Sequence, residues 1–117
     1  MRLNFPSIVL VVTLSEQAYA QASLDEFTLC SVAVGALASH DERKTQQVSQ
    51  FINQVLEQLD REHGQLGEPA ILNDGLKTAL VAATRGACGQ RERSTISIEA
   101  NKVYRSMRAL YSGTNVK

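Results

Sequence analysis

The side chains best suited to covalent or metal chemistry in this sequence are Cys30, Cys88, His40 and His63. A pair of cysteines forms a disulfide or remains as two free thiols, depending on the compartment in which the protein folds. Two cysteines alone cannot complete a four-ligand structural zinc site, and the histidines are not spaced to supply the missing ligands. We therefore expect no metal site.

The histidines and the adjacent carboxylates are explained by helix ends. His63 falls in the last turn of an expected helix, where the dipole and the last carbonyls favour it, and His40 falls beside an expected N-cap. The carboxylate pairs at 25–26 and 41–42 fall in first turns, where negative charge is favourable. The sequence has no Gly-rich phosphate loop, H-E-x-x-H, G-x-S-x-G or C-x-x-C motif. We expect neither an enzyme nor a bound cofactor.

Residues 1–20 have the pattern of a cleavable signal peptide. Arg2 and the amino terminus give a small positive region, residues 8–14 form an apolar run, and residues 18–20 (AYA) form a small-x-small cleavage signal. A bilayer-spanning helix needs about 20 apolar residues, so this run is too short for a membrane anchor. The alternative is an apolar N-terminal strand or buried helix. We expect export to the periplasm and a mature domain of residues 21–117.

The expected export also determines which oxidation state we expect for the two cysteines. A domain of fewer than 100 residues has a modest core, so a covalent link contributes usefully to its stability. In an oxidising compartment, the pair predicts a Cys30–Cys88 disulfide. Two buried free thiols are the alternative.

Residues 41–64 form the central predicted helix. Their apolar side chains recur at i, i+3, i+4 and i+7, the spacing of one buried helical face. Ser39 with Glu42 matches a capping box, and Gly64 is expected to end the helix. The apolar stripe consists of Val48, Phe51, Ile52, Val55, Leu56 and Leu59, whereas Asp60 is assigned to the opposite, polar face.

Three further helices are expected to cover this stripe: residues 24–38, residues 71–88 with a break near 73–74, and a last helix from residue 96 or 98 to residue 111. Pro69 is placed in the first turn of the third helix and Gly113 at the end of the last. The last helix also carries a basic stripe to which we assign no role: Lys102, Arg105 and Arg108. The sequence thus predicts an all-α, single-domain bundle of about four helices with one disulfide.

Charge is distributed unevenly along the chain. Residues 21–76 contain nine acidic and three basic side chains, and residues 77–117 contain eight basic and two acidic ones. Export and the scarcity of aromatic residues argue against nucleic acid as the partner. We interpret the two halves as neutralising each other within the fold or across a dimer. Because residues 29–38 are poor in polar side chains, we expect a homodimer at neutral pH.

Residues 76–104 carry a resemblance to a known family. Their apolar helix ends in Cys88, and a polar stretch then leads to a Ser/Thr-started helix with the pattern E-A-x-x-V. This arrangement resembles the C-terminal half of the HdeA/HdeB-type periplasmic proteins. Residues 27–30 lie where that family has its first cysteine, and residues 48–59 match its central helix. The segment between the cysteines is longer than in that family, and the aromatic that often flanks the first cysteine is not at the adjacent positions.

The resemblance implies an acid-stress chaperone, a homodimer near neutral pH that loosens in strong acid and binds unfolding proteins. The alternative is a Rap1A/Tai-like immunity protein that inhibits a periplasmic cell-wall amidase toxin, although the Phe-Cys-(Ile/Val)-Pro element associated with that class is missing. A structural subunit of an envelope complex is a third interpretation. The expected client or dimer surface consists of Phe27, Val34, Leu37, Phe51, Ile52 and Val55.

Overall fold

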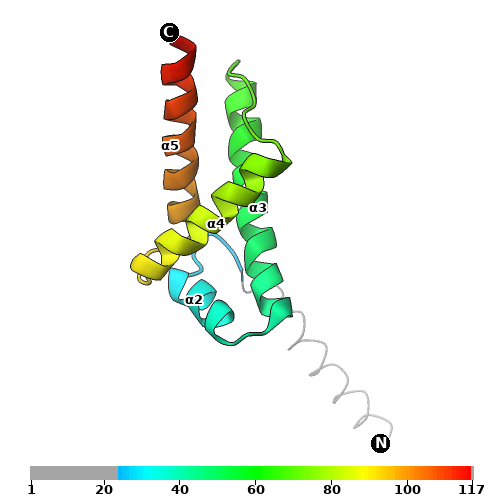
Figure 1. The fold of residues 1–117 in the computed structure, drawn as a ribbon, viewed down its shortest axis with the longest axis vertical. Coiled ribbons are helices and arrows are strands. Elements are labelled where there is room, and N and C mark those ends of the chain that lie inside the picture. Colours follow the sequence, from blue (N-terminus) through cyan, green and yellow to red (C-terminus); the bar gives the residue numbers. More distant parts are fainter. Residues whose placement is uncertain (1–23, 117) are drawn as a thin grey trace, which may run out of the picture.

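The computed structural model describes residues 24–116, with side chains to residue 111. This part of the chain forms four helices: α2 (Cys30–Ala38), α3 (Glu42–Gln65), α4 (Asp74–Gln90) and α5 (Ile96–Val116). Between residues 24 and 116 there is no strand, which confirms the all-α prediction. The long helices α3 and α5 lie side by side and run in the same direction, and α4 crosses them obliquely (Figure 1). The predicted signal peptide lies outside the described residues.

Each of the three longer helices buries a row of side chains spaced four residues apart. Side chains at this spacing form a ridge along a helix, and such ridges pack between those of a neighbouring helix. The rows are Val48, Ile52, Leu56 and Asp60 on α3, Leu80, Thr84 and Cys88 on α4, and Ile96, Ala100 and Tyr104 on α5. Phe51, Val55 and Leu59 flank the α3 row as partly buried side chains, so the predicted stripe does form the core.

The predicted disulfide is present. It joins Cys30, the first residue of α2, to Cys88 near the end of α4, with 4.8 Å between the two Cα atoms. Both cysteines are fully buried. The bond therefore holds the short helix α2 against α4 at one end of the bundle.

The first helix starts later than the sequence indicated. Residues 24–29 form a turn, in which the Asp25 carboxylate accepts from the Phe27 amide at 2.8 Å and the Thr28 hydroxyl accepts from the Asp25 amide at 2.8 Å. The chain then pairs with residues 94–96, because the Cys30 amide donates to the Ser94 carbonyl and the Ile96 amide to that of Thr28. These side-chain hydrogen bonds and the pairing with residues 94–96 satisfy the backbone N–H and C=O groups that helical hydrogen bonds would otherwise satisfy.

Both ends of α3 are capped by residues other than those predicted. Asp41, rather than Ser39, accepts from the Arg43 amide at 2.9 Å and is the N-cap. At the other end Gly67, rather than Gly64, adopts a φ of +85°, and the Glu68 amide donates to the His63 carbonyl at 3.0 Å. This is the Schellman arrangement, which needs a left-handed residue just after the helix and so favours glycine.

The boundaries of α4 and α5 also differ from the predictions. The break expected near residues 73–74 is the start of α4, where Asn73 accepts from the Leu76 amide at 2.8 Å. Pro69 consequently lies in an extended segment, residues 68–73, and not in a helix. The last helix starts at Ile96, the earlier of the two expected starts, and continues through Gly113 to Val116.

Candidate functional site

The most unusual feature of the interior is a buried carboxylate on α3. Asp60 continues the row of Val48, Ile52 and Leu56 and is only 9% exposed, so its assignment to the polar face was wrong. Its two oxygens accept from the backbone amides of Ile71, at 3.1 Å, and Leu72, at 3.2 Å. Asp60 thus binds the extended segment that precedes α4.

Two side chains of α5 complete the coordination of this carboxylate. The Tyr104 hydroxyl donates to Asp60 Oδ1 at 2.7 Å, and Arg108 Nη2 donates to the same oxygen at 3.1 Å. Arg108 Nη2 also donates to the Pro69 carbonyl at 2.8 Å, and Nε donates to the Tyr104 hydroxyl at 3.0 Å. We call Asp60, Tyr104 and Arg108 the Asp60 cluster. It connects α3, α5 and residues 69–72.

A histidine and a carboxylate, His63 and Glu68, cover the outer side of the Asp60 cluster. The His63 ring lies 5.5 Å from the Tyr104 ring, centroid to centroid, and its Nδ1 contacts the Glu68 carboxylate. Glu68 also lies 4.0 Å from Arg108 Nη1. His63 is therefore more than a partner of the helix end, because it links α3 to the start of the extended segment.

The electrostatics of the Asp60 cluster keep its carboxylate charged. Burial by itself would raise the pKa of Asp60, but the hydrogen bonds from Tyr104, Ile71 and Leu72 and the charge of Arg108 outweigh burial and lower that pKa below its ordinary 3.8. Burial and the bond to Asp60 raise the pKa of Tyr104 to about 12. The hydrogen bond with His63 lowers the pKa of Glu68. At neutral pH the cluster is therefore an ion pair with a neutral tyrosine between its members.

Protons can reach this carboxylate from solvent. Asp60 lines an open hollow of about 500 Å³ together with Glu57, Arg61, Asp74 and Lys77, among others. The charged groups around Asp60 are thus Arg108 from α5, Glu68 from the extended segment, and these four side chains of α3 and α4. A change in bulk pH acts on Asp60 without prior unfolding.

The other deeply buried carboxylate, Glu99, lies at the opposite end of α5 and is 1% exposed. The Ser94 hydroxyl donates to it at 2.6 Å, and Arg91 and Lys102 each approach it to 3.6 Å. Glu99 thereby fixes the turn between α4 and α5. The basic stripe of the sequence is divided by the fold, because Lys102 faces Glu99, Arg108 faces Asp60 and Arg105 is exposed.

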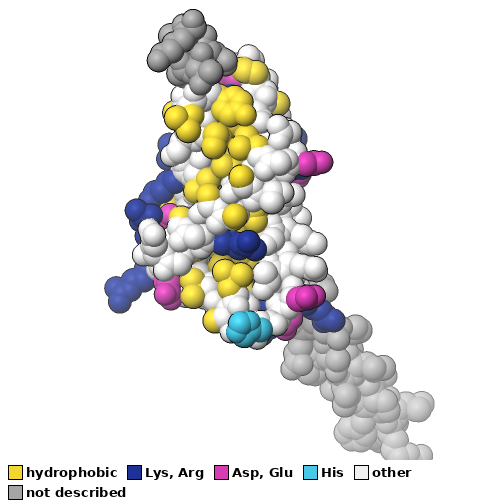
Figure 2. All heavy atoms as spheres, viewed as in Figure 1, with side chains coloured by type: hydrophobic (Ala, Val, Ile, Leu, Met, Phe, Trp, Pro, Cys, Tyr) yellow, Lys and Arg dark blue, Asp and Glu magenta, His cyan; other side chains and the backbone are white. Residues whose placement is uncertain are grey.

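The six residues predicted as a client or dimer surface do not form one surface in the closed fold. Ile52 is fully buried, whereas Phe27 is 76% exposed on the turn before α2. Phe51 and Val55 are partly buried against the core, Val34 is half-buried and Leu37 is exposed at the end of α2. On the face in Figure 2, apolar side chains form a band down the middle, with charged side chains mainly at its margins.

Fold and site together define a small all-α domain with one disulfide and an ion-pair cluster that joins the C-terminal end of α3 to the middle of α5. No family model, curated protein or solved structure matches the chain. Within residues 24–116, no helix is long and apolar enough to cross a membrane, and no three His, Cys, Asp or Glu side chains are gathered as metal ligands.

The sequence contained one signal for the Asp60 cluster. Asp60 extends an i+4 apolar row on one helix, and Arg108 extends the row Ile96, Ala100 and Tyr104 on another. Opposite charges that end two such rows indicate a buried pair if the rows pack together. When faces are assigned by the apolar stripe as a whole, Asp60 falls on the polar face and Arg108 in the basic stripe, so neither was predicted to be part of a buried pair.

Proposed function

We propose that this protein is a periplasmic acid-stress chaperone that is closed at neutral pH and opens in acid to hold unfolding proteins. The Asp60 cluster is the observation that carries this proposal. It joins the C-terminal half of α3, the middle of α5 and the segment before α4 through a group that titrates in acid. The disulfide suits an oxidising compartment such as the periplasm.

The sign of the pH effect follows from the lowered pKa of Asp60. A carboxylate whose pKa is lower in the folded than in the unfolded state stabilises the fold above the unfolded value, which is near 4. That stabilisation is lost as pH falls through the folded pKa. Once protonated, Asp60 no longer neutralises Arg108, and a buried cation without its partner is strongly destabilising. The cluster therefore favours the closed form at neutral pH and opening below about pH 4.

The disulfide limits how far the molecule opens. It does not titrate, and it keeps α2 attached to α4 at the end of the bundle away from the C-terminal end of α3. Meanwhile the positive charges of residues 21–117 lose their acidic counterparts and repel one another. Separation of α3 from α5 then uncovers the row at Ile52 and its partly buried neighbours Phe51 and Val55. These are half of the predicted client surface.

A client-protection assay tests the proposed function. At about pH 2–3, a molar excess of the protein should suppress light scattering by an acid-labile client, because this range lies below the ordinary carboxylate pKa. At neutral pH, with the same client unfolded by denaturant dilution, protection should be much weaker. Equal precipitation with and without the protein in acid would contradict the proposal. If the protein also binds a cell-wall amidase tightly at neutral pH, the immunity function replaces it.

The proposed form at neutral pH is a homodimer, and one exposed apolar patch is suited to be its interface. Phe27, Leu29, Val32 and Ile98 are each at least 46% exposed, and we call them the bridge patch. Leu29 pairs with Thr95 across the antiparallel bridge. Because Cys30 and Ile96, which follow these two residues, are fully buried, Leu29 and Thr95 face outward. Val32 and Ile98 follow them at helical spacing.

Opposite charges at the two ends of the bridge patch favour a second copy of this chain as the partner that packs on it. The bonds Thr28–Ile96, Cys30–Ser94 and Ser31–Glu92 fix the antiparallel order. The acidic residues 25–26 therefore lie beyond one end of this ladder, and the arginines of residues 91–93 lie at the other. A two-fold axis that lies in the interface at right angles to this ladder places the acidic end of each copy against the basic end of its partner.

Ile98→Asp should convert the neutral dimer to monomer. The side chain lies in the first turn of α5, where a carboxylate suits the helix dipole, so the fold should tolerate it. In the dimer, however, the new charge would be buried in an apolar contact without a partner. Sedimentation velocity at tens of micromolar should show a dimer for the wild type and for the control Leu66→Asp, an exposed site outside the patch. A monomeric wild type, or a dimeric Ile98→Asp variant, would contradict the prediction.

A further inference from the structure

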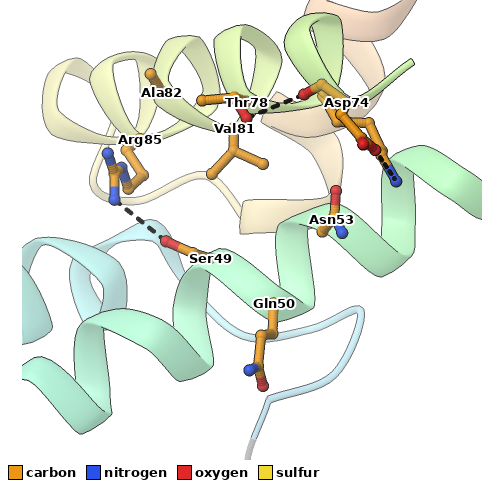
Figure 3. A pocket seen from close by; sticks show the side chains of 9 residues that line it. Ser49, Gln50, Asn53, Asp74, Thr78, Val81, Ala82 and Arg85 are labelled. Carbon is orange, nitrogen blue, oxygen red and sulfur yellow. Dashed lines mark hydrogen bonds and ion pairs between the residues drawn. The ribbon is translucent and has the colours of Figure 1, made fainter. Parts of the chain in front are cut away.

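A groove between α3 and α4 has the lining of a ligand site. It has a volume of about 490 Å³, within the range of small-ligand sites. Val81 and Ala82 supply apolar surface in its middle, and Ser49, Asn53 and Thr78 supply hydrogen-bonding groups. In Figure 3, Asn53 rises from α3 toward α4 and Val81 descends from α4 toward α3, whereas Gln50 points away from the gap. The groove thus offers a narrow apolar strip bordered by polar groups.

One end of this groove carries a cation without a carboxylate partner. Arg85 Nη1 donates to the Ser49 hydroxyl at 3.1 Å, and no carboxylate of the described part of the chain lies within ion-pair distance of its guanidinium. A guanidinium has five N–H donors in a planar fork that matches the two oxygens of a carboxylate. Arg85 lines this groove and retains N–H donors that are not used by Ser49, and these donors suit the carboxylate of a ligand.

The other end of the groove has an excess of negative charge. Lys77 Nζ lies 2.9 Å from the Glu57 carboxylate and 3.7 Å from that of Asp74. Two carboxylates thus share one ammonium, and the Asp74 side chain is exposed to solvent. This end can accept a further cationic group.

The separation of the two ends sets the length of a matching ligand. Asp74 and Arg85 are eleven residues apart on α4, or about 16 Å along the helix axis. An extended peptide advances about 3.3–3.6 Å per residue, so four or five residues span this distance. A peptide also provides backbone N–H and C=O groups for Asn53 and Thr78 and small side chains for the strip at Val81.

We propose that this groove binds a short peptide with free termini, its carboxylate on Arg85 and its ammonium at Asp74. The Arg85 end of the groove lies apart from the Asp60 cluster, whereas Asp74 and Lys77 also border the hollow at Asp60. The groove functions in the closed protein at neutral pH. It is thus independent of acid opening, and neither proposal depends on the other.

Titration of the protein with the tetrapeptide Ala-Ala-Val-Ala at neutral pH, followed by NMR, tests this inference. The backbone amides of Ser49, Thr78 and Val81 should shift with saturation, while that of Thr95 should not. Loss of one charge-assisted contact corresponds to about a tenfold loss of affinity. We expect such a loss with the C-terminal amide of the peptide and with Arg85→Gln. The variant Arg105→Gln, which removes an exposed arginine of α5, should bind as the wild type does.

Two comparisons separate specific recognition from general charge attraction. Asp74→Asn should weaken binding of the free peptide but leave binding of its N-acetyl form unchanged. Arg85→Lys keeps the charge and should restore only part of the affinity, because it lacks the planar fork. The inference is overturned if the amide binds as tightly as the free acid, if Arg85→Gln has no effect, or if acetate alone at the same concentration reproduces the shifts.

Discussion

Asp60→Asn should lower the free energy of unfolding at neutral pH by about 3 kcal/mol, the range observed when one partner of a buried ion pair is removed. Asparagine has nearly the same shape and still accepts a bond from the Ile71 amide, so no cavity forms. It carries no charge, however, and Arg108, whose side chain is 11% exposed, keeps only neutral acceptors and the more distant Glu68 carboxylate at 4.0 Å. For a domain of this size, the loss corresponds to a fall in Tm of more than about 10 °C.

The pH dependence of this variant distinguishes an acid-sensitive cluster from a merely structural one. Asp60 stabilises the wild type only while it is ionised, so the difference in unfolding free energy should be largest above about pH 5 and should shrink toward zero near pH 2. The variant should also protect clients at a higher pH than the wild type does, because part of its closed form is already lost.

Urea unfolding of both proteins across this pH range is the measurement. Glu62→Gln is the matched control, since it removes one charge from the same helix two residues away, at an exposed site bonded only to Gln58. It should change stability by less than about 0.5 kcal/mol at every pH. A constant difference between wild type and Asp60→Asn from pH 7 to pH 2 would show that Asp60 is not the acid-sensitive group.

Replacing both cysteines, Cys30→Ala with Cys88→Ala, should have the largest effect of all. The bond closes a loop between residues separated by 58 positions, and the chain-entropy model gives about 4 kcal/mol for a loop of this length. Alanine leaves no unsatisfied polar group in this fully buried site. Unfolding in urea at neutral pH should show this loss, and wild type unfolded under reducing conditions should behave in the same way.

The same variant tests the part that the disulfide plays in the acid-opened state. If the bond limits opening, the hydrodynamic radius at about pH 2 should be larger for the double variant than for the oxidised wild type. In the wild type the disulfide still joins α2 to α4, whereas in the variant nothing covalent limits the separation of these helices. Equal radii would show that the acid state is held together by other contacts. A stability loss below about 1 kcal/mol would instead mean that the unfolded chain is already compact.

The sequence by itself determined the helical class, the long central helix and the disulfide. These follow from local information: the spacing of Val48, Ile52 and Leu56 gives a helical face whatever packs on it, and a chain with two cysteines allows only one intramolecular disulfide. The interval of residues 41–64 agrees closely with the observed Glu42–Gln65 for the same reason. Caps were less predictable, because Ser39 and Asp41 are both suitable and only the path of the turn selects Asp41.

Only the tertiary structure decided that residues 24–29 form a turn and that Asp60 is buried. The turn exists because residues 94–96, distant in sequence, lie where they can bond to it. For Asp60 the reason is geometric. A row at i+4 spacing drifts by about 40° per step, so from Val48 to Asp60 it turns by about 120° around α3. On an isolated helix, a residue 120° around from Val48 faces the polar side. Asp60 is buried only because α5 and residues 69–72 cover that side of α3 near its C-terminal end.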